Sequence, residues 1–230
     1  MAKFDAIVFT AVPDASASSS GAMTKVDGRE SLLRAVEMFV NRDGVVQITV
    51  GLVPDQAEAI KTKLGSHLMI LGVKTASGGP ALLDQLKAAR AKLTPDSTHV
   101  IVHDAARPCV AQPELDALLD AAGGAEAMAM SSELAGTLVS LDETDRILET
   151  ISTRSLRALL TPQVFTRKFF DELCEKGFES VRSRLALFNS SRLNIRINSA
   201  SDATLARTYL TLMPKPKVKV SSNPFEEASW

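Results

Sequence analysis

The sequence predicts an α/β protein built on a doubly wound, mostly parallel sheet from which a β-arm protrudes. Short apolar runs alternate along the chain with longer stretches in which apolar residues recur at helical spacing. The polar run His103–Pro108 directly follows the apolar run Val100–Val102, as at the ligand-binding end of a buried strand. Residues 137–152 alternate apolar and polar side chains, which predicts a hairpin.

Each element is expected from its own pattern. Between residues 30 and 41, apolar side chains recur every three to four positions, as on one face of a helix. Pro54 and Pro113 stand where proline is favoured, in the first turn of a helix. Strands are expected over Asp5–Phe9, Val45–Leu52, His67–Leu71, Val100–Val102 and Ala125–Met130, and helices over Glu30–Asn41, Pro54–Leu64, Pro80–Leu93 and Pro113–Ala122.

Length and composition narrow the class of protein. A chain of 230 residues with 45% hydrophobic residues can bury one sizeable core, and we expect residues 1–213 to form a single domain. The net charge of −1 favours neither nucleic acid nor an anionic membrane as a partner. No apolar run is long enough to span a membrane, and the first residues lead directly into a strand, so we expect a cytoplasmic protein. Residues 214–230 read as a flexible tail.

The hairpin over residues 137–152, within an arm of about 135–153, has a consequence for assembly. An isolated two-stranded hairpin is only marginally stable in water and needs a surface to pack against. A second copy of the chain could supply that surface, which predicts a homodimer. The alternative is a hairpin that folds back on its own domain.

The segment His103–Pro108 carries the chemistry. Asp104 and Arg107 lie three residues apart just beyond a strand, where a carboxylate can bind Mg²⁺ and a guanidinium can hold a phosphate. The alternative is an Asp–Arg pair that only pins a loop. His103 is expected to be a hydrogen-bonded structural residue rather than a base.

The same segment resembles a known family. The string VHDAARP, residues 102–108, is similar to the signature of the 2-C-methyl-D-erythritol 4-phosphate cytidylyltransferases. Further elements agree in order and spacing, and the resemblance extends from about Phe4 to Met213. These elements are Asp27–Leu33 before the first helix, the TPQ element at Thr161–Gln163, the segment Asn194–Ile197, which is a strand in the family, and the helix-opening Asp202.

The resemblance implies a Rossmann-like nucleotidyltransferase that transfers a cytidylyl group from CTP to 2-C-methyl-D-erythritol 4-phosphate with Mg²⁺. It also implies a dimer in which each β-arm completes the pocket of the partner. By position, Lys25, Asp104 and Arg196 would be catalytic, with Asp104 also at the metal and the ribose. Nucleotide contacts would come from Ser20, Gly21, Ser77 and Gly78, and acceptor contacts from Arg107, Thr137, Arg154 and Thr161, with Thr153 as the alternative to Arg154.

Two segments depart from the family pattern. The loop after the first strand reads TAVPDASASSSGAM and lacks the early glycines and the arginine of the family. The family's TDDAS element is also absent, and residues 178–193 read FESVRSRLALFNSSRL. These departures leave two alternatives open: a non-catalytic member that binds a nucleotide or a partner protein, and a cytidylyltransferase for another polyol phosphate such as ribitol or glycerol phosphate.

Overall fold

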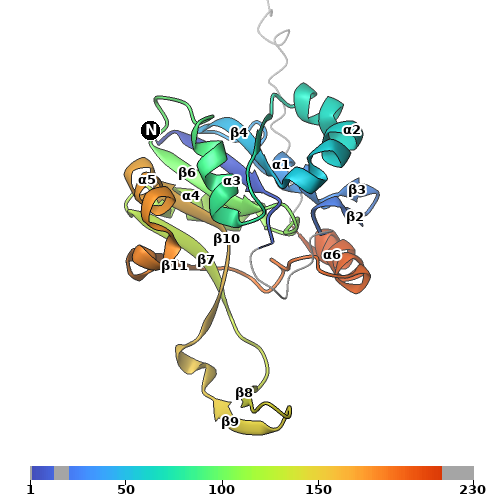
Figure 1. Ribbon diagram of the computed structural model, residues 1–230, viewed down its shortest axis with the longest axis vertical. Coiled ribbons are helices and arrows are strands. Elements are labelled where there is room, and N and C mark those ends of the chain that lie inside the picture. Colours follow the sequence, from blue (N-terminus) through green and yellow to red (C-terminus); the bar gives the residue numbers. More distant parts are fainter. Residues whose placement is uncertain (1, 13–20, 214–230) are drawn as a thin grey trace, which may run out of the picture.

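The computed structural model describes residues 2–12 and 21–213. Ser20 and the predicted tail, residues 214–230, lie outside the described residues. Seven strands form the main sheet in the order β11-β7-β10-β6-β1-β4-β5 (Figure 1). The bounds of these strands are β1 Phe4–Phe9, β4 Val45–Leu52, β5 Lys74–Ser77, β6 His99–Asp104, β7 Ala127–Glu133, β10 Arg157–Thr166 and β11 Ala186–Asn189.

The predicted sheet class is confirmed. Strands β1, β4, β5 and β6 pair in parallel, and β7 pairs in parallel with β11. Strand β10 is the exception, because it runs antiparallel to both β6 and β7. Its C-terminal half joins the core and its N-terminal half leads back from the arm. Among the described residues, no helix is long and apolar enough to cross a membrane.

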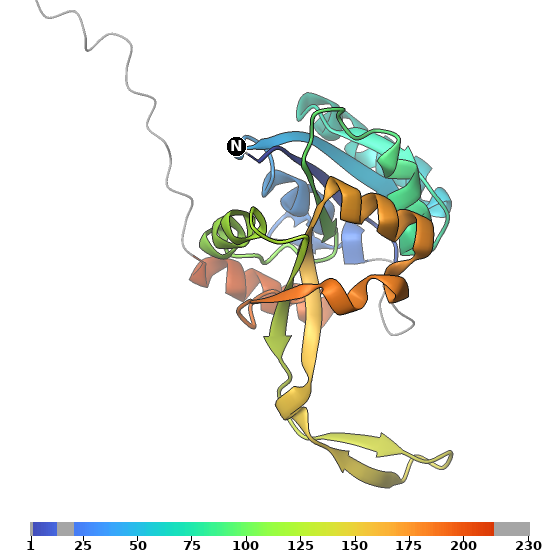
Figure 2. The ribbon, with the colours of Figure 1, turned by 90° about the vertical axis from the view of Figure 1, so that its left-hand side faces the viewer.

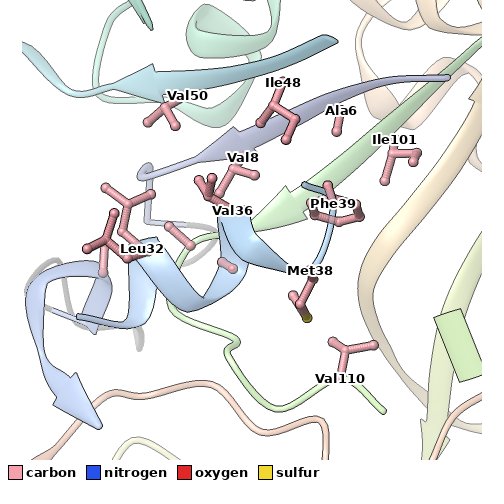
Figure 3. Close-up of a cluster of buried hydrophobic side chains, with 14 of the residues drawn as sticks. Ala6, Val8, Leu32, Val36, Met38, Phe39, Ile48, Val50, Ile101 and Val110 are labelled. Atoms are coloured by element: carbon pink, nitrogen blue, oxygen red, sulfur yellow. The ribbon is translucent and has the colours of Figure 1, made fainter. Parts of the chain in front are cut away.

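Helices cover both faces of the sheet, and each face has its own apolar core. One core holds side chains of α1, α2 and α4, and the other holds side chains of α3 and α5. In Figure 3, Leu32 and Val36 of α1 face the strands that carry Val8, Ile48 and Val50, which lie above the helix in this view. The helix bounds are α1 Ser31–Glu37, α2 Pro54–Ile70, α3 Leu82–Arg90, α4 Gln112–Ala122, α5 Arg167–Lys176 and α6 Ala200–Leu212.

The short elements complete the chain. Strands β2 Lys25–Val26 and β3 Arg29–Glu30 form a small ribbon, and α6 packs against β2 in a third apolar cluster. Strands β8 Leu138–Leu141 and β9 Ile147–Ile151 form the predicted hairpin, which projects far from the helix-covered body (Figure 2). Single 3₁₀ turns are η1 Gly21–Met23, η2 Thr153–Ser155, η3 Phe178–Ser180 and η4 Arg182–Arg184.

Two of the predicted strands are wrong. The run His67–Leu71 is not a strand, because α2 continues to Ile70 and the next strand, β5, begins at Lys74. The buried residues Ala57, Ile60, Leu64 and Leu68 form one continuous helical stripe, whereas a short apolar run by itself fits either structure. Residues 194–197 are irregular rather than extended in a sheet, since Ile197 donates its backbone N–H to the loop residue Ala106.

Strand register brings the candidate segments to one edge. Phe9, the last residue of β1, pairs with Asp104 on one side and with Gly51 on the other, and Leu52 pairs with Ser77. The loops that follow β1, β5 and β6 therefore leave the sheet side by side. This is the edge at which open α/β sheets bind ligands.

Candidate active site

His103, in β6, holds the loop that follows this strand through hydrogen bonds of its ring. Its ring Nε2 lies 3.0 Å from the carbonyl oxygen of Arg107, and its Nδ1 lies 3.2 Å from the hydroxyl of Thr161. A carbonyl can only accept, so Nε2 carries the proton and Nδ1 accepts from the threonine. The same hydroxyl accepts the backbone N–H of Asp104 at 3.0 Å. His103 and Thr161 thus hold both ends of the Asp104–Arg107 turn.

The carboxylate of Asp104 lies in this turn and is 2% exposed. Its Oδ1 accepts the backbone N–H of Ala106 at 2.8 Å, and its Oδ2 accepts from Nε of Arg196 at 2.8 Å. Nε of Arg107 lies 3.9 Å from the same Oδ2. Three residues predicted to be functional, separated by up to 92 positions in sequence, therefore meet at one carboxylate.

The segment that carries Arg196 is held at both ends. On one side, the backbone of Ile197 donates to the carbonyl of Ala106 at 2.9 Å. On the other side, Ser199 caps α6, and Asp202 in the first turn of that helix accepts the backbone N–H of Asn198 at 2.9 Å. This reciprocal cap fixes where α6 begins and so fixes the residues just before it.

Gly21 joins the end of the loop after β1 to this assembly. A Cβ atom at position 21 would lie 2.1 Å from the carbonyl oxygen of Ile197 and 2.9 Å from Cβ of Ala106. Only glycine permits so close an approach of three backbone segments. The loop predicted to hold the triphosphate therefore ends in direct contact with the Asp104 turn and the Arg196 segment.

Three further predicted site residues are less buried than Asp104: Lys25, Ser77 and Gly78. The Lys25 side chain is 66% exposed on β2 and its ammonium lies 3.7 Å from a carboxylate oxygen of Glu30. Ser77 is exposed at the end of β5. Gly78 donates its backbone N–H to Leu52 at 3.1 Å, and a Cβ there would meet the carbonyl oxygen of Asp84 at 2.6 Å.

Thr137 and Arg154 are not brought to Asp104 within one chain. Thr137 is exposed just before β8, and Arg154 lies in η2, next to Thr153, just after β9; because Leu138 pairs with Ile151, both flank the same open end of the hairpin. Figure 1 shows the hairpin β8–β9 at the far end of the arm, away from the sheet that carries Asp104. An acceptor pocket that contains Arg107, Thr137 and Arg154 cannot form from a single copy in this arrangement.

The residues at Asp104 do not present a preformed Mg²⁺ site. Both carboxylate oxygens are already hydrogen-bonded, and Arg196 and Arg107 neutralise the charge that would attract a cation. Within residues 2–12 and 21–213 there is no cluster of three or more His, Cys, Asp or Glu side chains that could hold a metal. Asp104 would become a ligand only if Arg196 released Oδ2, and we assign no step to a metal at this position.

A cavity of about 320 Å³ opens beside Asp104 and Arg107. Its polar end is formed by these two residues with Thr161 and Gln163, and the rest of its wall is apolar. The apolar wall comes from α3, α5, η3 and strands β1, β6 and β10: Phe9, Leu82, Leu83, Leu86, Val102, Leu159, Phe165, Leu173 and Phe178.

Sequence reasoning assigned no role to two buried polar residues beside this site. Asn194 donates its side-chain amide to the carbonyl of Thr161 at 2.8 Å and accepts Nη1 of Arg107 on its backbone oxygen at 2.8 Å. Gln85 accepts two backbone N–H groups of the loop after β1. The sequence did contain a sign of the role of Gln85, because this polar residue occupies a core position of a helix, between the apolar residues Leu82 and Leu86.

The parallel sheet, its converging loops and the carboxylate–arginine centre define an α/β protein with a nucleotide- or phosphate-binding edge. The family model of 2-C-methyl-D-erythritol 4-phosphate cytidylyltransferase matches residues 15–212, nearly the whole chain. This protein belongs to the 2-C-methyl-D-erythritol 4-phosphate cytidylyltransferase family, a family of nucleotidyltransferase enzymes.

Individual relatives agree. The chain is 30% identical over 211 residues to the 2-C-methyl-D-erythritol 4-phosphate cytidylyltransferase of Rhodopirellula baltica, covering 80% of this chain and 84% of that protein. It is 32% identical over 147 residues to the enzyme of the same name from Frankia casuarinae, covering 64% of this chain and only about half, 53%, of that longer protein. The crystal structure of the Thermus thermophilus enzyme has the same fold, with a TM-score of 0.71 at 20% identity over 92% of this chain and 100% of that one.

The buried histidine makes the stability of this site depend on pH. Burial lowers the pKa of His103 to about 3, against the hydrogen bond to the Arg107 carbonyl, which raises it. The unfolded chain binds this proton near pH 6.5, so the free energy of unfolding should fall as the pH drops below 6.5. The slope from this residue is at most about 1.4 kcal/mol per pH unit and ends near pH 3.

Urea unfolding of His103→Gln and wild type at pH 7.0, 6.0, 5.0 and 4.0 measures this slope. The variant is expected to be less stable at pH 7 but to lose less stability on acidification. His67→Gln, on the exposed face of α2, is the matched control and should follow the wild type. Parallel curves for His103→Gln and wild type would show that His103 is not the group that titrates.

Proposed function

We propose that this protein transfers the cytidylyl group of CTP to 2-C-methyl-D-erythritol 4-phosphate at the edge formed by the loops after β1, β5 and β6. The observation that carries the proposal is the meeting of Gly21, Asp104, Arg107 and Arg196 at one point, in a chain of this family. A phosphate oxygen of the acceptor forms a bond to the α-phosphorus of CTP. The bond from that phosphorus to the bridging oxygen breaks, and pyrophosphate leaves with the electron pair.

Such a reaction depends on positioning and on cations near the phosphates rather than on a base, since the attacking phosphate is already ionised. Lys25, exposed and only loosely paired, is free to move onto the triphosphate. Arg196 would contribute its guanidinium at the transferred phosphorus, which requires it to share or leave Asp104. Arg107 would place the acceptor phosphate. Thr161 would act by holding the Asp104 turn, because its hydroxyl is already bonded on both sides.

The nucleotide would lie between the loop after β1 and the turn after β5. Gly21, and Ser20 beyond the described residues, would offer donors to the phosphates, and Ser77 and Gly78 would face the base. Mg²⁺ is expected to arrive with the triphosphate, where it neutralises phosphate oxygens, rather than to wait in a preformed site.

The arm supports a homodimer. Large apolar side chains are exposed along it, including Leu141, Ile147 and Leu148 at 50%, 67% and 66%. A hairpin of this kind gains stability when a second chain covers it. The partner's arm would then bring Thr137 and Arg154 to the acceptor side of Arg107. We place the protein in the cytoplasm, where CTP is available.

The reaction is tested by pyrophosphate release from CTP and Mg²⁺, with and without 2-C-methyl-D-erythritol 4-phosphate. Asp104→Ala should lower acceptor-dependent release by about 100-fold or more, because it removes the carboxylate that neutralises the buried guanidinium of Arg196. Asp116→Ala, which removes a largely exposed carboxylate on α4, is the matched control.

Ribitol and glycerol phosphates in the same assay separate this acceptor from other polyol phosphates. The relatives reported above favour 2-C-methyl-D-erythritol 4-phosphate. Absence of release with every acceptor, together with no rise in melting temperature on adding CTP, would refute catalysis and leave a non-catalytic member of the family.

A further inference from the structure

Gln85 is a polar side chain enclosed in an apolar layer. It lies on α3 and is 0% exposed, among buried residues of that helix such as Leu86 and Ala89. Glutamine is rarely so completely buried unless a hydrogen-bonding task keeps it there. A leucine at this position would pack equally well against the neighbouring apolar residues, so the reason for the amide must lie in what it bonds.

One end of this amide holds the start of the loop after β1. Oε1 accepts the backbone N–H of Thr10 at 3.0 Å and that of Ala11 at 3.2 Å. These are the first two residues after β1 ends at Phe9. The direction in which the loop leaves the sheet is therefore set by a side chain 74 residues further along the chain.

Two glycines make room for this contact. A Cβ at Gly51 would lie 3.0 Å from Oε1 of Gln85, and a Cβ at Gly78 would lie 2.7 Å from its Cα. Gly51 is on β4, and Gly78 belongs to the turn after β5. Three neighbouring strands thus bring their carboxyl ends against the same glutamine.

The other end of the amide finds no partner in the part of the chain that the structure describes. Nε2 is buried and has no hydrogen-bond partner among the described residues. A buried donor left without a partner destabilises the folded state, and such groups in native proteins call for an explanation. A ligand bound at this edge would supply the missing partner.

We propose that Gln85 is the positioning residue of the nucleotide site, which orients the loop after β1 through Thr10 and Ala11 and satisfies its free amide N–H when CTP is bound. This inference rests on the proposed function, since it assumes that the loop receives CTP. It assigns Gln85 to the nucleotide and not to the acceptor phosphate, which lies on the Arg107 side of the edge.

The test measures CTP affinity by calorimetry and the KM values for CTP and acceptor separately. Gln85→Met keeps the length of the side chain and removes both hydrogen-bonding ends. It should weaken CTP binding and raise the KM for CTP at least about tenfold, while the KM for the acceptor stays within about twofold. Gln47→Met, the same change at a half-buried site on β4 away from this edge, should behave as wild type.

Gly51→Ala gives a second, milder variant in case Gln85→Met fails to fold. It leaves Gln85 in place but forces its amide aside by a few tenths of an ångström, and it should weaken CTP about threefold or more. If the folded variants bind CTP within twofold of wild type, the inference is wrong. If wild type itself does not bind CTP, the proposed function fails instead, and the two failures are thereby distinguished.

Discussion

Gly21→Ala is expected to reduce kcat/KM by at least about 100-fold, because the new methyl group would collide with the carbonyl oxygen of Ile197 at 2.1 Å. Ile197 and Ala106 are joined by a backbone hydrogen bond, from the Ile197 N–H to the Ala106 carbonyl, and therefore resist moving apart to admit the methyl group. Relief of the clash must therefore separate the loop after β1 from the Asp104 turn and the Arg196 segment. Overpacking of this kind also destabilises a fold by about 1–3 kcal/mol.

Steady-state kinetics and urea unfolding of the purified variant measure both effects. Gly65→Ala is the matched control, because a Cβ there meets nothing within 4 Å and the residue lies inside α2. Alanine in that helix should stabilise the protein by up to about 1 kcal/mol and leave catalysis unchanged. Wild-type kinetics for Gly21→Ala would mean that contact between the loop and the Asp104 turn is not needed for activity.

Mixing two inactive variants is expected to restore activity if each arm serves the site of the partner subunit. Asp104→Ala disables the site in the body, and Arg154→Ala disables the arm. In a symmetric dimer that exchanges subunits, half of the molecules are mixed, and one of their two sites carries neither change. The mixture should therefore regain about a quarter of wild-type activity.

The two variants are co-expressed with different tags, and the mixed dimer is isolated on both tags before assay. Free of the two parent dimers, it should show about half of wild-type activity, since one of its two sites is intact. Asp104→Ala alone should be about 100-fold or more below wild type, and Arg154→Ala alone about 10- to 100-fold below it, the magnitude expected for one lost charge-assisted contact. If the mixed dimer is as inactive as the two parent variants, Arg154 does not act in the site of the partner subunit, and each arm acts in the site of its own chain. A monomer by sedimentation would contradict the dimer itself.

The altered loop after β1 becomes easier to understand from the structure. Its backbone is anchored at the start by Gln85, which accepts the N–H groups of Thr10 and Ala11, and at the end by the close approach of Gly21 to Ile197. Donors to a triphosphate are largely backbone N–H groups, which many side chains permit. The catalytic proposal therefore depends on the contacts at the two ends of the loop and not on the identities of the side chains between them.

Much of the fold could be predicted because its signals are local. Apolar runs marked β1, β4 and β6, helical spacing marked α1 and α4, and alternation marked the hairpin β8–β9. The error at His67–Leu71 arose where a short apolar run fits either structure, since Met69 and Ile70 are in fact 75% and 80% exposed on α2. The motif around Asp104 was also readable in sequence, because it is six contiguous residues.

The long-range contacts of the site residues, in contrast, depend on the tertiary structure. The sheet class, the family and the turn that carries Asp104 and Arg107 follow from local patterns in the sequence. These patterns did not determine that Arg196 neutralises Asp104 from 92 residues away, or that Gly21 lies against Ile197. Contacts at such separations are set by strand register and by where helices begin, and these depend on the packing of the whole sheet rather than on any local pattern.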